Sequence, residues 1–190
     1  ILALILTMMA GIVLGMGMPT TPAYIVQVAL LVPALVKLGV VLEAAHMFVF
    51  YFAILSAITP PVAMAVYAAN GLSQAGLWHT GLAPVKLGAT GYIVPFMFVF
   101  GPSILMIGNL STIALTAVTS ILGVACLSGG LFGYFLTVAA IWERVVLVAA
   151  AITLIKPGIT TDVIGVAAVA VVVASQFWRL RARAAAARAT

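Results

Sequence analysis

Long apolar stretches alternate along this chain with short segments of glycine, proline and polar residues. A helix that crosses a bilayer needs about 20 predominantly apolar residues, because each residue adds about 1.5 Å to its length. Residues 91–109 and 111–128 fit this requirement, and residues 145–155 and 163–178 form a shorter pair. None of these four stretches contains a charged residue. They predict transmembrane helices in the second half of the chain.

The first half of the chain is interrupted twice. Two short apolar stretches, 1–14 and 23–36, flank the segment GMGMPTTP, and this arrangement predicts a re-entrant helical hairpin over residues 1–36. The next apolar stretch, 44–57, reaches the segment ITPP before it continues. Two consecutive prolines remove two backbone donors and clash with the preceding turn. A broken helix is therefore predicted over residues 44–77.

The two interruptions are candidate ligand-binding positions. Non-helical backbone at membrane depth is tolerated only where protein buries it or where it lines a water-filled cavity, and interrupted helices mark binding sites in transporters. Glycines let the backbone approach a ligand, and hydroxyl and carbonyl oxygens suit a hard cation such as Na⁺. The alternative is an ordinary kink that binds nothing. The candidate binding residues are Gly15, Gly17, Pro19, Thr20, Thr21, Ser56, Thr59, Pro60 and Pro61.

The remaining segments complete the predicted organisation. The tryptophan, histidine and lysine of residues 78–90 suit a short amphipathic segment on the membrane surface. The glycine-rich residues 129–142 either lengthen a span or lie on the surface, and we favour the surface because Glu143 and Arg144 fit an interface better than a bilayer centre. The predicted parts are a transport-site repeat at 1–77, an interfacial segment at 78–90, transmembrane helices at 91–128, C-terminal membrane segments at 129–178 and a basic tail at 179–190.

The composition requires a bilayer as solvent. Hydrophobic residues make up 66% of the chain and charged residues 6%, and the mean hydropathy is +1.36. A soluble domain carries roughly 25% charged and about 45–50% apolar residues. The chain therefore has too little polar surface to cover a water-soluble globule. The fold class predicted from these observations is an all-α polytopic membrane protein.

The charge distribution indicates topology. Of the eight basic residues, Arg179, Arg181, Arg183 and Arg188 lie near the end of the chain, and the net charge is +5. No aromatic residue is interleaved with them, so a nucleic-acid partner is not predicted. Arginines directly after an apolar helix hold that end in the cytoplasm. We therefore expect a cytoplasmic C-terminus.

No enzyme chemistry is predicted. The chain has neither the HExxH pattern of zinc proteases nor a G-x-S-x-G elbow, and Gly15 and Gly17 lack the strand–helix context of a dinucleotide site. His46 and His79 have no companions at metal-ligand spacing. The single cysteine, Cys126, excludes a disulfide within the chain and is interpreted as a small packing residue.

Two long motifs resemble a known family. GMGMPTTPAYIVQVALLVPALVKLGV and AAHMFVFYFAILSAITPPVAMAVYAANG resemble the large permease subunit of tripartite ATP-independent periplasmic (TRAP) transporters. Within that group they are similar to the fused permeases that work with TAXI-type substrate-binding proteins. The looser motifs GYIVPFMFVFGPSILMIG, WERVVL and KPGITTDVIG are similar to the same group. The resemblance therefore covers essentially the whole chain.

The resemblance implies an elevator-type secondary transporter in a bacterial or archaeal cytoplasmic (inner) membrane. Such a permease receives a small organic anion from a periplasmic binding protein and uses the Na⁺ gradient, with no other cofactor. The family's transport domain has two inverted repeats, each with a hairpin and a broken helix. This chain would hold the second repeat, with its hairpin tip at residues 15–22 and its broken helix at 59–61. We expect the first repeat and a small membrane domain to belong to a longer protein.

The functional hypothesis is sodium-coupled import of a small carboxylate. Gly17, Thr20 and Thr59 are the candidate Na⁺ ligands, and the other hydroxyls and nearby carbonyls bind either the ion or the substrate carboxylate. Two other classes stay open. A channel would conduct without sodium coupling, and a structural membrane subunit would only scaffold a complex.

Overall fold

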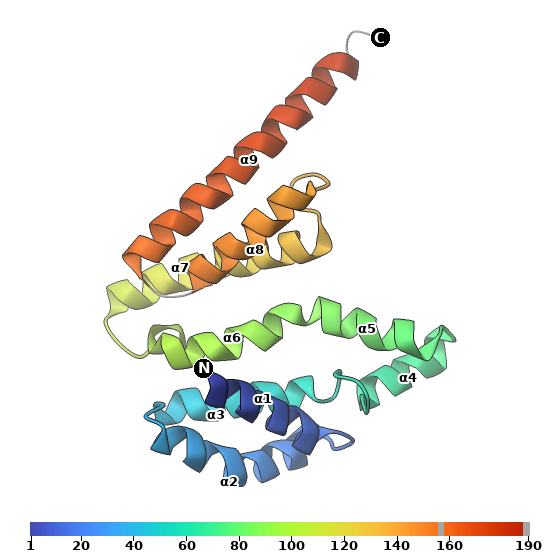
Figure 1. Ribbon diagram of the computed structural model, residues 1–190, viewed down its shortest axis with the longest axis vertical. Coiled ribbons are helices and arrows are strands. Elements are labelled where there is room, and N and C mark those ends of the chain that lie inside the picture. The colour runs from blue at the N-terminus through green and yellow to red at the C-terminus, as the bar shows by residue number, and fades with distance from the viewer. Residues whose placement is uncertain (156–157, 188–190) are drawn as a thin grey trace. The chain divides into compact units, whose positions relative to one another are not determined.

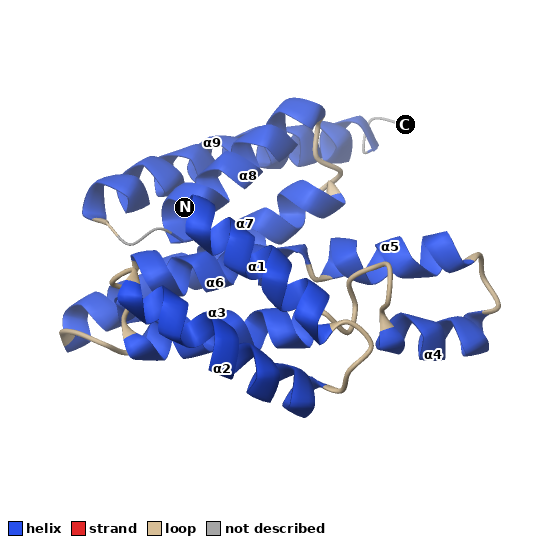
Figure 2. Cartoon of the chain, turned by 60° about the horizontal axis from the view of Figure 1, so that its bottom comes forward, coloured by secondary structure: helices blue, strands red, loops and turns tan. Residues whose placement is uncertain are grey.

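The computed structural model describes residues 1–155 and 158–187, and it divides into two compact units, Ile1–Leu105 and Met106–Thr190. Within the described residues every regular element is a helix, apart from one isolated bridge between Tyr134 and Val138 (Figures 1 and 2). The predicted all-α polytopic membrane class is confirmed. Helical stretches long and apolar enough to cross a membrane are, among these residues, Thr20–Lys37, Leu77–Phe100, Leu110–Phe132 and Thr160–Arg181.

The first unit begins with a helical hairpin. Helix α1 (Leu2–Gly15) and helix α2 (Thr20–Lys37) are joined by a four-residue tip, and both pack against helix α3 (Leu42–Leu55). The tip contains glycine and proline, which interrupt the hydrogen bonding that would otherwise make one continuous helix.

The helix that follows the hairpin is broken. Helix α3 ends at Leu55, and the chain resumes as helix α4 (Met64–Ser73) after an irregular segment that contains a cis peptide between Pro60 and Pro61. The two prolines lack the backbone donors that a helix needs, so the interruption follows directly from the sequence. Helix α4 then packs against helix α5 (Leu77–Leu87).

The prediction of one spanning helix over residues 91–109 is wrong. Helix α6 (Ala89–Phe100) ends nine residues earlier, and a short 3₁₀ helix, η1 (Pro102–Leu105), follows it. Pro102 lacks a backbone donor and disfavours helical geometry at the preceding glycine, which explains the early end. Only one residue separates α5 from α6, and together they are long enough to span, so the interfacial location of residues 78–90 stays a prediction.

Aromatic packing on α3 forms the core of the first unit. Phe48 and Phe52 lie one helical turn apart with ring centroids 4.9 Å apart, and Phe96 of α6 lies 5.3 Å from Phe48 in an edge-to-face arrangement. Leu4 of α1 and Leu35 of α2 are buried in the same cluster. Helix α3 thus lies between the hairpin and α6 (Figure 1), and its position determines where the break lies.

In the second unit the described residues form three helices, α7 (Leu110–Phe132), α8 (Ile141–Ile155) and α9 (Ile159–Ala187). Helices α7 and α8 approach closely, because a Cβ on Gly123 would lie 2.6 Å from Cγ1 of Ile155. Small residues at helix contacts are common in membrane proteins for this reason. Cys126 is buried on α7, which agrees with its interpretation as a packing residue.

Two predicted segments of this unit have different limits in the structure. Helix α7 runs to Phe132, so the start of the segment 129–142 lengthens this helix. A loop begins at Gly133 with φ 72°, and the last two residues of the segment begin α8. Helix α9 continues to Ala187, because alanine and arginine are strong helix formers. The part of the 179–190 tail up to residue 187 is therefore helical, and Arg188 lies outside the described residues.

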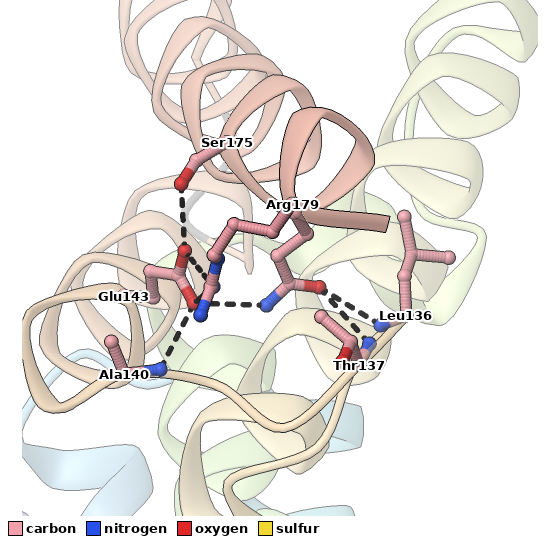
Figure 3. Close-up of polar contacts among 7 residues, drawn as sticks. Leu136, Thr137, Ala140, Glu143, Ser175 and Arg179 are labelled. Atoms are coloured by element: carbon pink, nitrogen blue, oxygen red, sulfur yellow. Dashed lines mark hydrogen bonds and ion pairs between the residues drawn. The ribbon is translucent and has the colours of Figure 1, made fainter. Parts of the chain in front are cut away.

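Glu143, which the sequence analysis places at a membrane interface, lies in the interior of the second unit, and its depth in a membrane stays a prediction. Its side chain is fully buried and accepts hydrogen bonds from the Ala140 backbone (3.0 Å), Ser175 Oγ (2.8 Å) and Gln176 Nε2 (3.1 Å). It also forms an ion pair with Arg179, whose guanidinium contacts both carboxylate oxygens (Figure 3). A buried carboxylate is tolerated when it is paired and hydrogen-bonded in this way.

The polar cluster around Glu143 joins three parts of the second unit. Gln176 of α9 accepts hydrogen bonds from the backbone of Leu136 (3.0 Å) and Thr137 (3.4 Å), both in the loop before α8 (Figure 3). The neighbouring Arg144 donates to the carbonyls of Gly130 and Leu131 at the end of α7 (both 3.0 Å). Both adjacent charged residues therefore take part in contacts between the elements of this unit.

Replacing Glu143 should destabilise the second unit. We expect Glu143→Gln to lower the free energy of unfolding by about 1–3 kcal/mol, because it removes the charge that pairs with Arg179 and changes one acceptor into a donor. Thermal unfolding in detergent, followed by helical circular dichroism, measures this loss. Glu43→Gln, at an exposed residue of α3, is the control and should change stability by less than about 0.5 kcal/mol. Equal melting of the two variants would contradict the role given to the cluster.

Candidate functional site

The tip of the hairpin lies against the broken helix. Gly15 ends α1, and Gly17 follows with φ 73°, a left-handed conformation that glycine adopts without strain. A Cβ on Gly17 would meet Cγ1 of Val62, in the break after α3, at 3.5 Å. The two interruptions, which are far apart in the sequence, are therefore neighbours in the fold.

The closest approach is between Gly15 and Ser56. A Cβ on Gly15 would lie 2.3 Å from Oγ of Ser56 and 2.7 Å from its Cβ, so no side chain fits at this position without movement. Ser56 itself is completely buried. The structure thus brings together residues from both predicted halves of the site through a contact that only glycine permits.

Hydroxyl groups in the break have identifiable partners. Ser56 Oγ donates to the carbonyl of Ala53 (2.7 Å), and Thr59 Oγ1 donates to the carbonyl of Leu55 (2.6 Å). Because the proton of Thr59 is used in this way, the hydroxyl of Tyr92 on α6 donates to Thr59 Oγ1 (2.6 Å). Thr59 therefore links the break to α6, in addition to any contact that it makes with a ligand.

The other predicted site residues lie in the same two interrupted segments. Pro19, Thr20 and Thr21 lie at the start of α2, where Thr20 is half-buried and the other two are exposed. Pro60 and Pro61 line a small, mostly apolar pocket of ≈ 110 Å³. Its other lining residues are Ala63, Val66, Tyr67, Leu77, Trp78 and Gly81.

Sequence reasoning missed Gln27. This residue of α2 is completely buried, and within the described chain neither its Oε1 nor its Nε2 has a hydrogen-bond partner. Its Nε2 lies 2.9 Å from the position of a Cβ on Gly15, and its Oε1 lies 3.1 Å from that of a Cβ on Gly11. The available signal was a single amide in the middle of an apolar stretch.

The site is electrically neutral in its own residues. Residues 15–22 and 56–63 contain no charged side chain, and the described residues contain no cluster of histidine, cysteine, aspartate or glutamate that could hold a metal ion. His46, interpreted as structural, lies with its Nδ1 2.9 Å from the Tyr24 hydroxyl and so connects α3 to α2. The arrangement offers neutral oxygens and irregular backbone, which suit a monovalent cation better than acid–base chemistry.

The contact between Gly15 and Ser56 can be tested with a second substitution that relieves the effect of the first. Gly15→Ala should lower the free energy of unfolding by about 1–3 kcal/mol, because the added methyl group overpacks the contact. Ser56→Gly removes the two nearest atoms, so the double variant should recover part of the loss. Thermal unfolding in detergent gives both values.

Gly71→Ala is the control for this experiment, since a Cβ there would meet nothing within 4 Å. That variant should be neutral or slightly stabilising. A loss in Gly15→Ala that Ser56→Gly does not reduce would contradict the contact.

Two family models match different parts of the chain. Residues 1–113 match the family described as "Tripartite ATP-independent periplasmic transporter, DctM component", and both interruptions lie within this match. Residues 113–185, which include the Glu143 cluster, match a domain of unknown function, DUF3394. No significant match is found among curated proteins or solved structures. Because the first match covers more than half of the chain and agrees with the motifs, this integral membrane protein belongs to the DctM family, the large permease component of TRAP transporters.

Proposed function

We propose that this chain forms one half of the ion- and substrate-binding site of a sodium-coupled permease that imports a small organic anion. The observation that supports this proposal is the contact between the hairpin tip and the break, through Gly15 and Ser56. Two irregular backbone segments that meet inside a membrane protein provide unpaired carbonyl and amide groups for a ligand. A TRAP permease works with a periplasmic substrate-binding protein, and we propose the TAXI type for this one on the basis of its motifs.

The chemistry of the site favours sodium over protons as the coupling ion. Proton coupling through a side chain needs a titratable group, and neither interruption contains Asp, Glu or His. Sodium needs neutral oxygens, which hydroxyls and unwound carbonyls supply. The first turn of α2, which begins at Thr20, presents unpaired N–H groups that favour the carboxylate of a substrate.

A scaffolding role is the second candidate, and it concerns the second unit. Glu143 and Gln176 find their partners inside this unit, so their polar groups are used for structure. We propose that the transport chemistry lies in the first unit and that the second unit supports it.

Transport by the complete carrier should depend on sodium. Replacing Na⁺ with choline in an uptake assay with the binding protein should abolish accumulation, because choline is too large for a shell of hydroxyls and carbonyls. Potassium chloride at the same ionic strength controls for a general salt effect. Accumulation that persists in choline would contradict sodium coupling, and a flux that does not saturate would favour the channel alternative.

Thr59→Val should reduce the apparent sodium affinity by roughly tenfold to a hundredfold. The substitution keeps the branched shape and removes a hydroxyl, and an unpaired buried partner costs about 1–3 kcal/mol. Tyr92→Phe is the matched variant, because it removes the other hydroxyl of the same hydrogen bond and leaves Thr59 Oγ1 in place. Sodium-dependent uptake of the two variants separates the roles. A larger effect of Thr59→Val indicates direct coordination, whereas equal effects would leave Thr59 as a link between the break and α6.

The C-terminal end of α9 should face the cytoplasm. Arg179, Arg181, Arg183 and Arg188 follow the apolar run that ends at Trp178, and arginines within about 15–20 residues of a span determine orientation. A fusion of alkaline phosphatase to this end should be inactive, and a reporter that is active only in the cytoplasm should be active. The opposite pair of results would invert the orientation.

A further inference from the structure

Two glutamines of this chain are completely buried, and their surroundings are opposite. Gln176 uses both ends of its amide, since Oε1 accepts from the backbone of Leu136 and Thr137 and Nε2 donates to Glu143. Gln27 uses neither end: its Oε1 and its Nε2 have no partner among the described residues. Gln27 is therefore the buried amide that needs an explanation.

An unpaired amide in an apolar interior lowers stability. Burying a polar group without a hydrogen bond costs folding free energy, and an apolar side chain of the same shape avoids that cost. Methionine has the same length and flexibility as glutamine and would fill the space between α1 and α3 without an unpaired group. A ligand that binds the amide of residue 27 would compensate for this cost.

The position of Gln27 indicates where that ligand lies. Its Nε2 lies 2.9 Å, and the Oγ of Ser56 lies 2.3 Å, from the same point, the position of a Cβ on Gly15. The amide therefore ends at the contact between the hairpin tip and the break. Its other end lies against α1 and α3, where a Cβ on Gly11 would meet Oε1 at 3.1 Å and Phe52 Cβ at 3.3 Å.

The groups at this position favour a cation. Ser56 donates its proton to the Ala53 carbonyl, so its oxygen has lone pairs available to a ligand. Half a turn about the last side-chain bond of Gln27 exchanges Oε1 and Nε2, and this rotation breaks no hydrogen bond because neither atom has one. Oε1 then takes the place of Nε2, 2.9 Å from the point that Ser56 Oγ approaches to 2.3 Å. Both oxygens are neutral, whereas protein sites for divalent hard cations rely on carboxylates, and residues 15–22 and 56–63 contain none.

We propose that Gln27 is a ligand of the coupling cation: its Oε1 and the Oγ of Ser56 coordinate one sodium ion where the hairpin tip meets the break. This inference rests on the proposed sodium-coupled function and adds to it a ligand from within α2. Sodium binding then ties the hairpin to the broken helix, because the two oxygens come from the two elements.

The test compares Gln27→Met with Gln176→Met in the complete carrier. For Gln27→Met we expect the half-saturating sodium concentration for uptake to rise by about tenfold or more, as for the loss of a group that supports a metal ligand, with thermal stability kept or increased. In the purified carrier without substrate, the rise in unfolding temperature that sodium produces should shrink in the same variant. Gln176→Met should lower the thermal stability, because it removes the hydrogen bonds to Leu136, Thr137 and Glu143. It should leave the half-saturating sodium concentration unchanged.

The outcomes separate this inference from the function on which it rests. A folded Gln27→Met carrier with unchanged half-saturating sodium would overturn the inference and leave sodium coupling intact. Sodium-independent uptake by the unchanged carrier would overturn both. If Gln27→Met does not fold, Gln27→Asn keeps the amide and draws its oxygen back by one methylene group. Asparagine at this position should also weaken sodium binding, and unchanged binding would overturn the inference.

Discussion

Backbone groups that lack water as a partner impose the main constraint on this fold. Inside a bilayer every N–H and C=O group must find a partner in the protein, which favours uninterrupted helices. The chain departs from this rule after Gly15 and again after Leu55, and the fold places the two departures against each other. The place where these two interruptions meet depends on α3. Phe48 and Phe52 of this helix pack into the core, and its last turn leads into the break. The site is thus a consequence of where the core holds this helix.

The sequence was most informative where local chemistry decides the structure. Glycine and proline mark both interruptions, and apolar length predicts most of the helices, because these effects act within a few residues. The meeting of Gly15 with Ser56 depends on packing between distant segments, which no local pattern encodes. Gln27 carried a weak signal, a lone amide among apolar residues, that identifies neither its burial nor its neighbours. The early end of α6 at Phe100 was predictable from Pro102, but apolar length dominated the prediction.

The two buried glutamines, one in each part of the chain, are used differently. In the second unit Glu143 has a partner for each of its oxygens, and Gln176 has one for each end of its amide. In the first unit the amide of Gln27 is buried without a partner. Adjacent charged residues such as Glu143 and Arg144 resembled surface anchors because their side-chain partners, apart from Ala140, lie 13 to 36 positions away in the sequence. An internally satisfied group stabilises a fold, whereas an unsatisfied one keeps capacity for a ligand. Ser120, Asp162 and Arg179 of the second unit also keep one buried polar atom each without a partner among the described residues.

The burial of Cys126 makes this chain convenient for chemical labelling. It is the single cysteine in the sequence, and it lies in the packed interior of α7, where a thiol is shielded from reagents. A cysteine introduced at exposed Val62 or Gly17 would be the reactive thiol of the chain, with Cys126 left in place, although at Gly17 it would strain a backbone with φ 73°. A bifunctional reagent placed across these two positions, where a Cβ on Gly17 would meet Cγ1 of Val62 at 3.5 Å, would fasten the hairpin to the broken helix. Transport measured with this cross-link in place then shows whether the carrier can complete its cycle while the hairpin and the broken helix stay joined.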